Sequence, residues 1–196
     1  LNGFIGMGVE EDWATHMTYS FANGGNDQYA FKTLSKWAGV MNQKSVPEAS
    51  YPYQLDQEKT TYTFKAEDVS YILTGQKYIN MKERDLVKQA IIENGAVSTI
   101  YTTNQERSDK YVYYSEPTGS GHEVTIVGWD DNIDKSLFAA NGYETPPGNG
   151  AWLIKNSWGS NTGNNGYFWM SYYESSIQNM NAVIYEIVPA DTYDYN

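Results

Sequence analysis

Cysteine is absent from this sequence of 196 residues, and its absence excludes two kinds of structure. A chain without thiols forms no disulfide bond and holds no metal ion through thiolate ligands. Basic residues are also scarce, because 13 Lys and Arg stand against 24 Asp and Glu, and the formal net charge is -11. This charge argues against nucleic acid or an anionic membrane surface as a partner. No apolar run approaches the roughly 18 residues of a membrane span, so none is predicted.

The residues that are present describe a globular chain. Hydrophobic residues make up 40% of the sequence, aromatic residues 15% and charged residues 19%. This balance is typical of folded rather than disordered proteins. The length suffices for one domain of ordinary size, or for two small lobes that share a cleft.

The hydrophobic pattern changes along the chain from helical to strand-like. It predicts helices at 10–21 and 28–41, the second capped by Asp27, then strand and connection over 59–73. A capping box at Asn80–Glu83 predicts a third helix that stops at Gly95. From residue 96 the alternation predicts six strands, at 97–101, 111–114, 123–129, 151–156, 166–173 and 182–187. We therefore expect one α+β domain over 1–196, with helices and crossing segments in 1–95, strands in 96–188 and a tail at 189–196.

A histidine and an asparagine stand in settings that favour catalysis. His122 lies in Gly-His-Glu-Val, and Asn156 lies in Lys-Asn-Ser-Trp-Gly. An imidazole can take a proton from a nucleophile and pass it to a leaving amine if a partner holds its ring in one tautomer. The side-chain carbonyl of Asn156 can be that partner, and Trp158 can keep water away from the hydrogen bond. For each residue the alternative is a structural role in a strand or a turn.

Four motifs in order resemble the papain-like cysteine peptidases. They are Asn23-Gly24-Gly25, Tyr51-Pro52-Tyr53, the strand His122–Trp129 and the segment from Lys155 to Tyr167. The resemblance runs from about residue 9 to about residue 188. It implies a two-lobed fold, with a helical left lobe, an antiparallel β-barrel-like right lobe and the active cleft between them.

The resemblance also implies a nucleophilic cysteine, activated by an imidazole, that this sequence lacks. In the family that cysteine precedes the Asn-Gly-Gly turn by several tens of residues, whereas here the turn begins at Asn23. We therefore expect a divided enzyme, in which a cysteine-bearing light chain from the same precursor completes the site. The interpretation requires no cofactor and no metal.

The resemblance further implies which residues meet a peptide or protein substrate. The backbone of Gly25, in the turn with Gly24, corresponds to the position that pairs with substrate, although a tight turn alone would explain both glycines. Further positions around the cleft are occupied by Asn26, Gln28, Ile100, Ser120 and Gly121. Thr162 stands where papain has a tryptophan on the leaving side. These polar replacements argue against a simple preference for bulky apolar side chains.

Several alternatives stay open. A papain-fold binding or scaffold protein could retain the motifs without activity, and a transpeptidase or ligase would use the same thiolate. Asp130, Asp131, Asn132 and Asp134 could supply oxygen ligands for calcium, but the stretch lacks the glycine and distal glutamate of an EF-hand, which favours a solvated acidic turn. The absence of cysteine points, by analogy within the family, to a bacterial type. The acidic charge favours solubility outside the cell, and we expect a secreted or cell-surface location.

Overall fold

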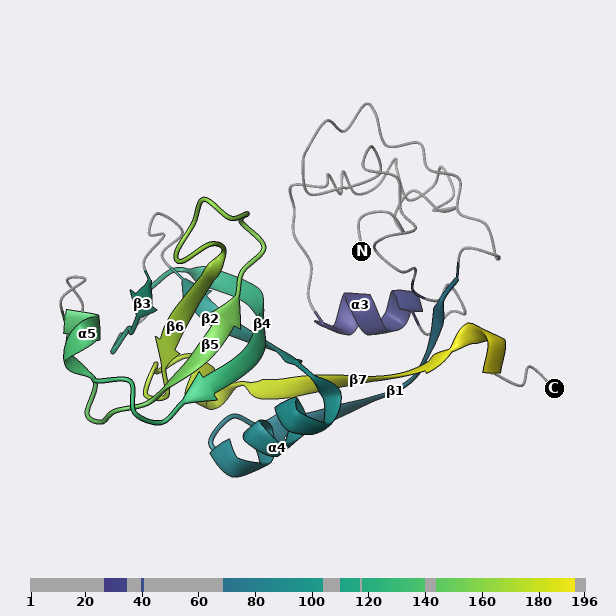
Figure 1. The fold of residues 1–196 in the computed structure, drawn as a ribbon, viewed down its shortest axis with the longest axis horizontal. Coiled ribbons are helices and arrows are strands. Elements are labelled where there is room, and N and C mark those ends of the chain that lie inside the picture. Colours follow the sequence, from purple (N-terminus) through teal and green to yellow (C-terminus); the bar gives the residue numbers. More distant parts are fainter. Residues whose placement is uncertain are drawn as a thin grey trace. The chain divides into compact units, whose positions relative to one another are not determined.

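The computed structural model describes residues 27–34, 40, 69–103, 110–116, 118–139 and 144–192, and the fold is given for these. Their elements follow the chain in the order shown in Figure 1. They are α3 (Asp27–Thr33), β1 (Tyr71–Asn80), α4 (Arg84–Asn94), β2 (Val97–Thr103), β3 (Tyr111–Val112), β4 (Ser120–Asp130), α5 (Ser136–Ala139), β5 (Ala151–Lys155), β6 (Tyr167–Ser171), the 3-10 helix η7 (Ile177–Asn179), β7 (Asn181–Pro189) and the 3-10 helix η8 (Ala190–Thr192). Two compact units result, Leu1–Gly75 with Tyr185–Asn196, and Gln76–Ile184.

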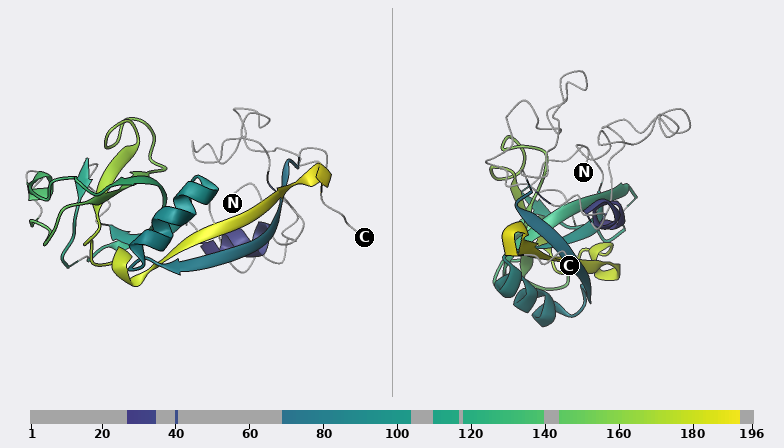
Figure 2. Two further views of the ribbon diagram at one scale, coloured as in Figure 1. Left: turned by 60° about the horizontal axis from the view of Figure 1, so that its bottom comes forward. Right: turned by 90° about the vertical axis from the view of Figure 1, so that its right-hand side faces the viewer.

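The described strands form one seven-stranded sheet in the order β1-β7-β2-β4-β5-β6-β3. β2 pairs antiparallel with β7 and with β4, and β5 pairs antiparallel with β4 and with β6. The short β3 pairs with β6 in parallel. Figure 2 shows β1 and β7 running side by side. The strands β4, β5 and β6 follow one another in the chain and in the sheet, within the second unit, and they position the candidate site.

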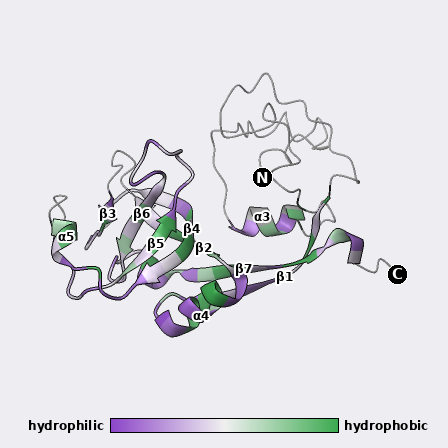
Figure 3. Ribbon diagram, in the orientation of Figure 1, coloured by the Kyte–Doolittle hydropathy of each residue, from purple (hydrophilic) through white to green (hydrophobic). Residues whose placement is uncertain are grey.

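Alternation along β2 and β4 creates the core of the second unit. Val97, Thr99, Tyr101 and Thr103 are buried, whereas the residues between them are only partly buried. Val124 and Ile126 continue the buried face across β4. Figure 3 shows hydrophobic stretches along these central strands and a mixed pattern on α4. Every second side chain along these strands therefore belongs to the buried inner face, and the side chains between them lie on the more polar opposite face.

The helix predicted before Gly95 is present as α4, and it belongs to the second unit. Val87, Ala90 and Ile91 are its buried residues, and α4 contacts β2 and β4. Gly95 ends the helix with φ +82°, and its N–H donates to the carbonyl of Ile91 at 2.8 Å. On the sequence pattern this helix is expected with the other helices of 1–95, but its buried apolar residues pack against β2 and β4.

The capping box predicted at the start of α4 is wrong. The Asn80 side chain instead accepts the N–H of Lys82 at 2.9 Å, and its carbonyl accepts the N–H of Glu83 at 2.9 Å. Glu83 is the N-cap residue and makes no side-chain capping bond. Asn80 therefore closes a turn before the helix rather than capping it.

The remaining predictions of secondary structure divide into three groups. The six strands predicted after residue 96 are confirmed, with ends that differ by a few residues. The structure adds α5 inside the segment expected to be irregular and extends the first strand to Asn80. Asp27 begins α3 as a first-turn residue, and the predicted helix at 10–21 lies outside the described residues. No helix among the described residues has the length and apolar character needed to cross a membrane.

Candidate active site

Two neighbouring strands bring His122 and Asn156 together. His122 lies near the beginning of β4, and Asn156 directly follows β5. Because β4 and β5 pair antiparallel, the end of β5 returns to the beginning of β4. His122 Nε2 lies 2.8 Å from Asn156 Oδ1. The two residues predicted as a catalytic pair are therefore in direct contact.

The hydrogen bonds of Asn156 fix the tautomer of the imidazole. The backbone N–H of Ser157 donates to Asn156 Oδ1 at 2.8 Å, so this atom must be the carbonyl oxygen of the amide. A carbonyl oxygen only accepts, and His122 Nε2 must carry the proton that it donates. The proton on Nε2 leaves Nδ1 of the neutral ring with its lone pair, ready to accept a proton from another group.

A glycine-punctuated turn holds Asn156 in place. The backbone N–H of Asn156 donates to the carbonyl of Gly166 at 2.9 Å, and the N–H of Gly166 donates to the carbonyl of Thr162 at 2.8 Å. The Thr162 hydroxyl donates to the carbonyl of Gly159 at 3.0 Å. Gly166 has φ +87°, and a Cβ on it would lie 3.3 Å from the Gly159 oxygen. Only glycine suits this position, because both the conformation and the close approach disfavour a side chain.

Two aromatic rings confine the imidazole. Trp158 stacks on His122 with ring centroids 4.7 Å apart and an interplanar angle of 23°. Tyr101, which pairs with His122 across β2 and β4, presents its ring at 5.9 Å and 64°. Tyr101 is only 2% exposed. The sequence did not indicate Tyr101 as a site residue, because only the register of β2 on β4 places it beside His122.

Burial and hydrogen bonding act in opposite directions on the imidazole. Burial lowers the pKa of His122 below its ordinary value, while the hydrogen bond to Asn156 raises it and only partly offsets the burial. The neutral ring is therefore favoured at neutral pH, which suits a group that must first accept a proton.

Three residues predicted to bind substrate lie close to this pair. Gly121 pairs with Thr102 and Ser120 with Thr103 along β2 and β4. A Cβ on Gly121 would lie 3.5 Å from Ile100 Cγ2, so Gly121 and Ile100 are neighbours on one face. Gln28 lies exposed in α3, in the first unit. The predicted residues Gly24, Gly25 and Asn26 lie outside the described residues.

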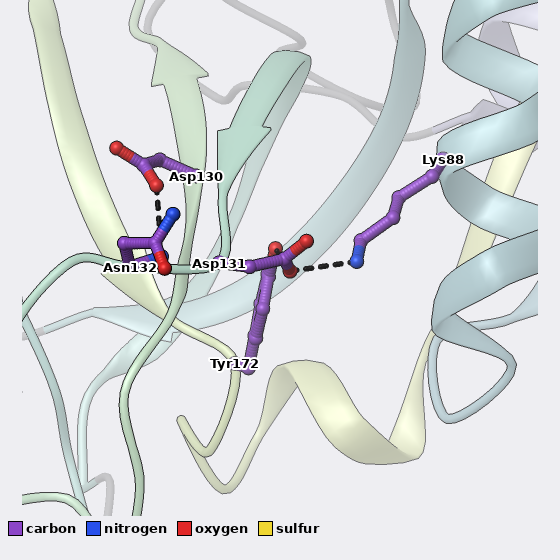
Figure 4. A network of polar contacts seen from close by, with 5 residues as sticks. All are labelled: Lys88, Asp130, Asp131, Asn132 and Tyr172. Atoms are coloured by element: carbon purple, nitrogen blue, oxygen red, sulfur yellow. Dashed lines mark hydrogen bonds and ion pairs between the residues drawn. The ribbon is translucent and has the colours of Figure 1, made fainter.

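The acidic stretch after β4 directs its carboxylates to protein donors. Asp131 Oδ1 accepts a hydrogen bond from Lys88 Nζ at 2.7 Å and one from the Tyr172 hydroxyl at 2.8 Å, as Figure 4 shows. The bond from Lys88, followed by that from Tyr172, lowers the pKa of Asp131. Asp130 Oδ1 accepts the N–H of Asn132 at 2.8 Å, also visible in Figure 4, and Asp134 accepts the N–H of Ser136 at 2.8 Å.

Contacts within the protein engage the acids of this stretch. Within the described parts of the chain, no three His, Asp or Glu side chains gather as metal ligands would. Asp131 instead joins the end of β4 to α4 and to the segment after β6, while Asp134 accepts the backbone N–H at the start of α5. Asp131 and Asp134 therefore have structural roles within the protein.

Comparison with known proteins identifies relatives along most of the chain. The model of the papain family of cysteine proteases matches residues 15–187. Cathepsin S of Mus musculus is 32% identical over 133 residues, which are 63% of this chain and 33% of that protein. Vignain of Phaseolus vulgaris is 26% identical over 155 residues, which are 76% of this chain and 36% of that protein. The chain thus spans about a third of the length of these curated relatives.

Solved structures show the same fold. The clostridial cysteine protease Cwp84 after propeptide cleavage is similar with a TM-score of 0.64 and 27% identity, covering 95% of this chain and 51% of that one. A structure of the cysteine protease and lectin-like domains of Cwp84, a surface layer associated protein of Clostridium difficile, gives a TM-score of 0.62 and 28% identity, covering 86% and 38%. Bromelain from Ananas comosus, at 21% identity and a TM-score of 0.55 over 83% and 69%, supports the fold alone. The fold is therefore the expected α+β papain-like fold, and the chain belongs to the papain family of cysteine proteases.

Proposed function

We propose that this chain is the larger part of a cysteine endopeptidase that hydrolyses peptide bonds in peptides or proteins. His122 serves as base and then as acid, and Asn156 orients its ring. The thiolate comes from a cysteine-bearing light chain of the same precursor. No cofactor and no metal takes part.

The observation that carries the proposal is the fixed tautomer of His122. Its Nε2–H is committed to Asn156, so Nδ1 takes the proton of the thiol and forms an imidazolium beside the thiolate. After the thiolate attacks the peptide carbonyl, Nδ1–H gives its proton to the leaving amine. The same nitrogen then deprotonates the water that hydrolyses the thioester, and the cycle ends with the thiol restored.

A nucleophile from outside these 196 residues is proposed because His122 and Asn156 are hydrogen-bonded to each other while the sequence contains no cysteine. A site without a nucleophile gives the hydrogen bond between His122 and Asn156 no chemical use. We therefore prefer an enzyme whose nucleophile lies outside these residues, with a light chain as the proposed source, to a scaffold protein that has lost its activity. Water is the proposed acceptor, with transfer to an amine as the rival outcome.

A secreted or cell-surface location in a bacterium is also proposed. The net charge of -11 favours solubility at a cell exterior. One structural relative carries the description of a surface layer associated protein of Clostridium difficile. Both observations support this location.

Turnover of fluorogenic peptides by the natively purified protein tests the proposal. We expect hydrolysis by the parent protein and loss of at least about a hundredfold in kcat/KM in His122→Ala, because general base catalysis contributes factors of this order. Product analysis with an added amine distinguishes hydrolysis from transfer to the amine. Absence of both products in correctly folded protein would support a scaffold and contradict the proposal.

A further inference from the structure

We infer that Glu123 selects a basic side chain in the substrate, an inference that rests on the proposed peptidase function. Glu123 directly follows His122 on β4, yet none of the sequence motifs assigns it a role. Its surroundings on the strand pair β2 and β4 give it a defined position and a defined chemistry.

The register places Glu123 and His122 on opposite faces of the strand pair. His122 pairs with the buried Tyr101, whereas Glu123 pairs with Ile100, which is only partly buried. Side chains alternate along a strand, so Glu123 belongs to the face of Ile100. The Ser98 hydroxyl donates to Glu123 Oε1 at 2.6 Å, and this bond holds the carboxylate on that face.

The face around Glu123 combines an apolar and an anionic group. Gly121 has no side chain and is exposed, and a Cβ there would touch Ile100 Cγ2 at 3.5 Å. Gly121 therefore adds no side chain over Ile100, which is only partly buried. A Lys or Arg side chain matches this arrangement, because its aliphatic stem can lie on Ile100 while its cationic end meets the carboxylate.

The distance from the reacting atoms follows from the strand. Consecutive residues of a strand rise by about 3.3 Å, so an extended substrate whose cleaved bond lies at His122 would bring a side chain to Glu123 from one or two residues away, on the other face of the strand. Among the described residues on this face, Lys155 carries a positive charge that opposes this preference. It pairs with Thr125 on the same face and is exposed.

The test compares Arg with citrulline, which has nearly the same shape but no charge. The natively purified enzyme is first titrated with a thiol-directed peptidyl probe, so failure of the proposed function appears as no labelling before specificity is measured. Peptides carrying Arg or citrulline at one position at a time on the acyl side of the cleaved bond are then assayed. We expect kcat/KM to favour Arg about tenfold at one position, which corresponds to about 1.4 kcal/mol.

Three variants assign the preference to Glu123. Glu123→Gln can still accept the bond from Ser98 and should abolish the preference. Glu93→Gln removes the same charge from the exposed surface of α4 and should leave the preference unchanged, whereas Lys155→Gln should increase it.

Two results in labelled enzyme would overturn the inference, and a third applies if the variant is not labelled. One is equal use of Arg and citrulline at every position by labelled parent enzyme, and the other is a preference that persists in labelled Glu123→Gln. If Glu123→Gln is not labelled, the salt dependence of the preference for Arg is measured in the parent enzyme instead. A preference for Arg that falls as salt is added supports the carboxylate, and one that is independent of salt refutes it.

Discussion

Replacement of Asn156 by alanine removes a single oxygen that accepts two hydrogen bonds. One comes from His122 Nε2–H and the other from the N–H of Ser157, each at 2.8 Å. Each bond contributes about 1 kcal/mol, so the free energy of unfolding should fall by about 2 kcal/mol. The imidazole also loses the partner that fixes its tautomer. Misplacement of a catalytic group by about 1 Å can reduce the rate about a hundredfold, and we expect a loss of that size in kcat/KM for Asn156→Ala.

The same change alters the protonation of His122 in a defined direction. The bond to Asn156 raises the pKa of His122 against the larger effect of burial, so Asn156→Ala should lower the pKa further. A histidine whose folded pKa lies below the unfolded value of about 6.5 contributes stability above that pH and loses it as the pH falls. The variant should therefore lose stability on acidification more steeply than the parent.

Nitrogen-15 NMR of the imidazoles tests this prediction directly. These 196 residues contain two histidines, and the signals that disappear in His122→Gln are assigned to His122. In the parent, Nε2 should carry the proton in the neutral ring, and Asn156→Ala should show a mixture of tautomers. Asn161→Ala, an exposed change in the same loop, serves as the control. An unchanged tautomer together with unchanged kcat/KM in Asn156→Ala would refute the reasoning.

Three further predictions concern the surroundings of the pair. Trp158→Ala should raise the pKa of His122 toward its ordinary value, because removal of the stacked ring readmits water, and an NMR titration without such a rise would contradict this explanation. Gly166→Ala should lower the free energy of unfolding in urea by about 1 to 3 kcal/mol because of its positive φ, whereas Gly128→Ala, with no atom nearer than 3.9 Å to its new Cβ, should cost less. Burial raises the pKa of Glu174, so this carboxyl contributes stability that grows as the pH falls through the raised pKa toward about 4.3, and Glu174→Gln should lack this contribution relative to the parent. Parallel urea titrations of the parent and Glu174→Gln that show the same pH dependence would refute the last prediction.

The sequence predicts features whose causes are local or lie in the order of motifs. The end of α4 follows from Gly95, whose positive φ and N–H bond to Ile91 are local properties. The pairing of His122 with Asn156 follows from two motifs with their own chemistry, and the structure places them in contact. The central strands follow from alternation, because one face of β2 is buried and the other is not.

Features that depend on strand register or on competition between local hydrogen bonds could not be predicted from the sequence. Tyr101 and Glu123 acquire their neighbours only when β2 is aligned with β4. Asn80 has the spacing of a capping residue, but its side chain accepts the backbone N–H of Lys82 in the turn before α4. The short α5 contains Phe138, which is fully buried, so tertiary packing rather than propensity accounts for it.

The most direct test of the central claim is to map where a thiol-directed peptidyl probe binds, by mass spectrometry of the natively purified protein after denaturation. We expect the probe mass to appear on a cysteine in a second, small polypeptide and the labelling to disappear in His122→Ala. A folded protein that contains only these 196 residues and resists the probe would contradict the account, as would labelling that persists without His122.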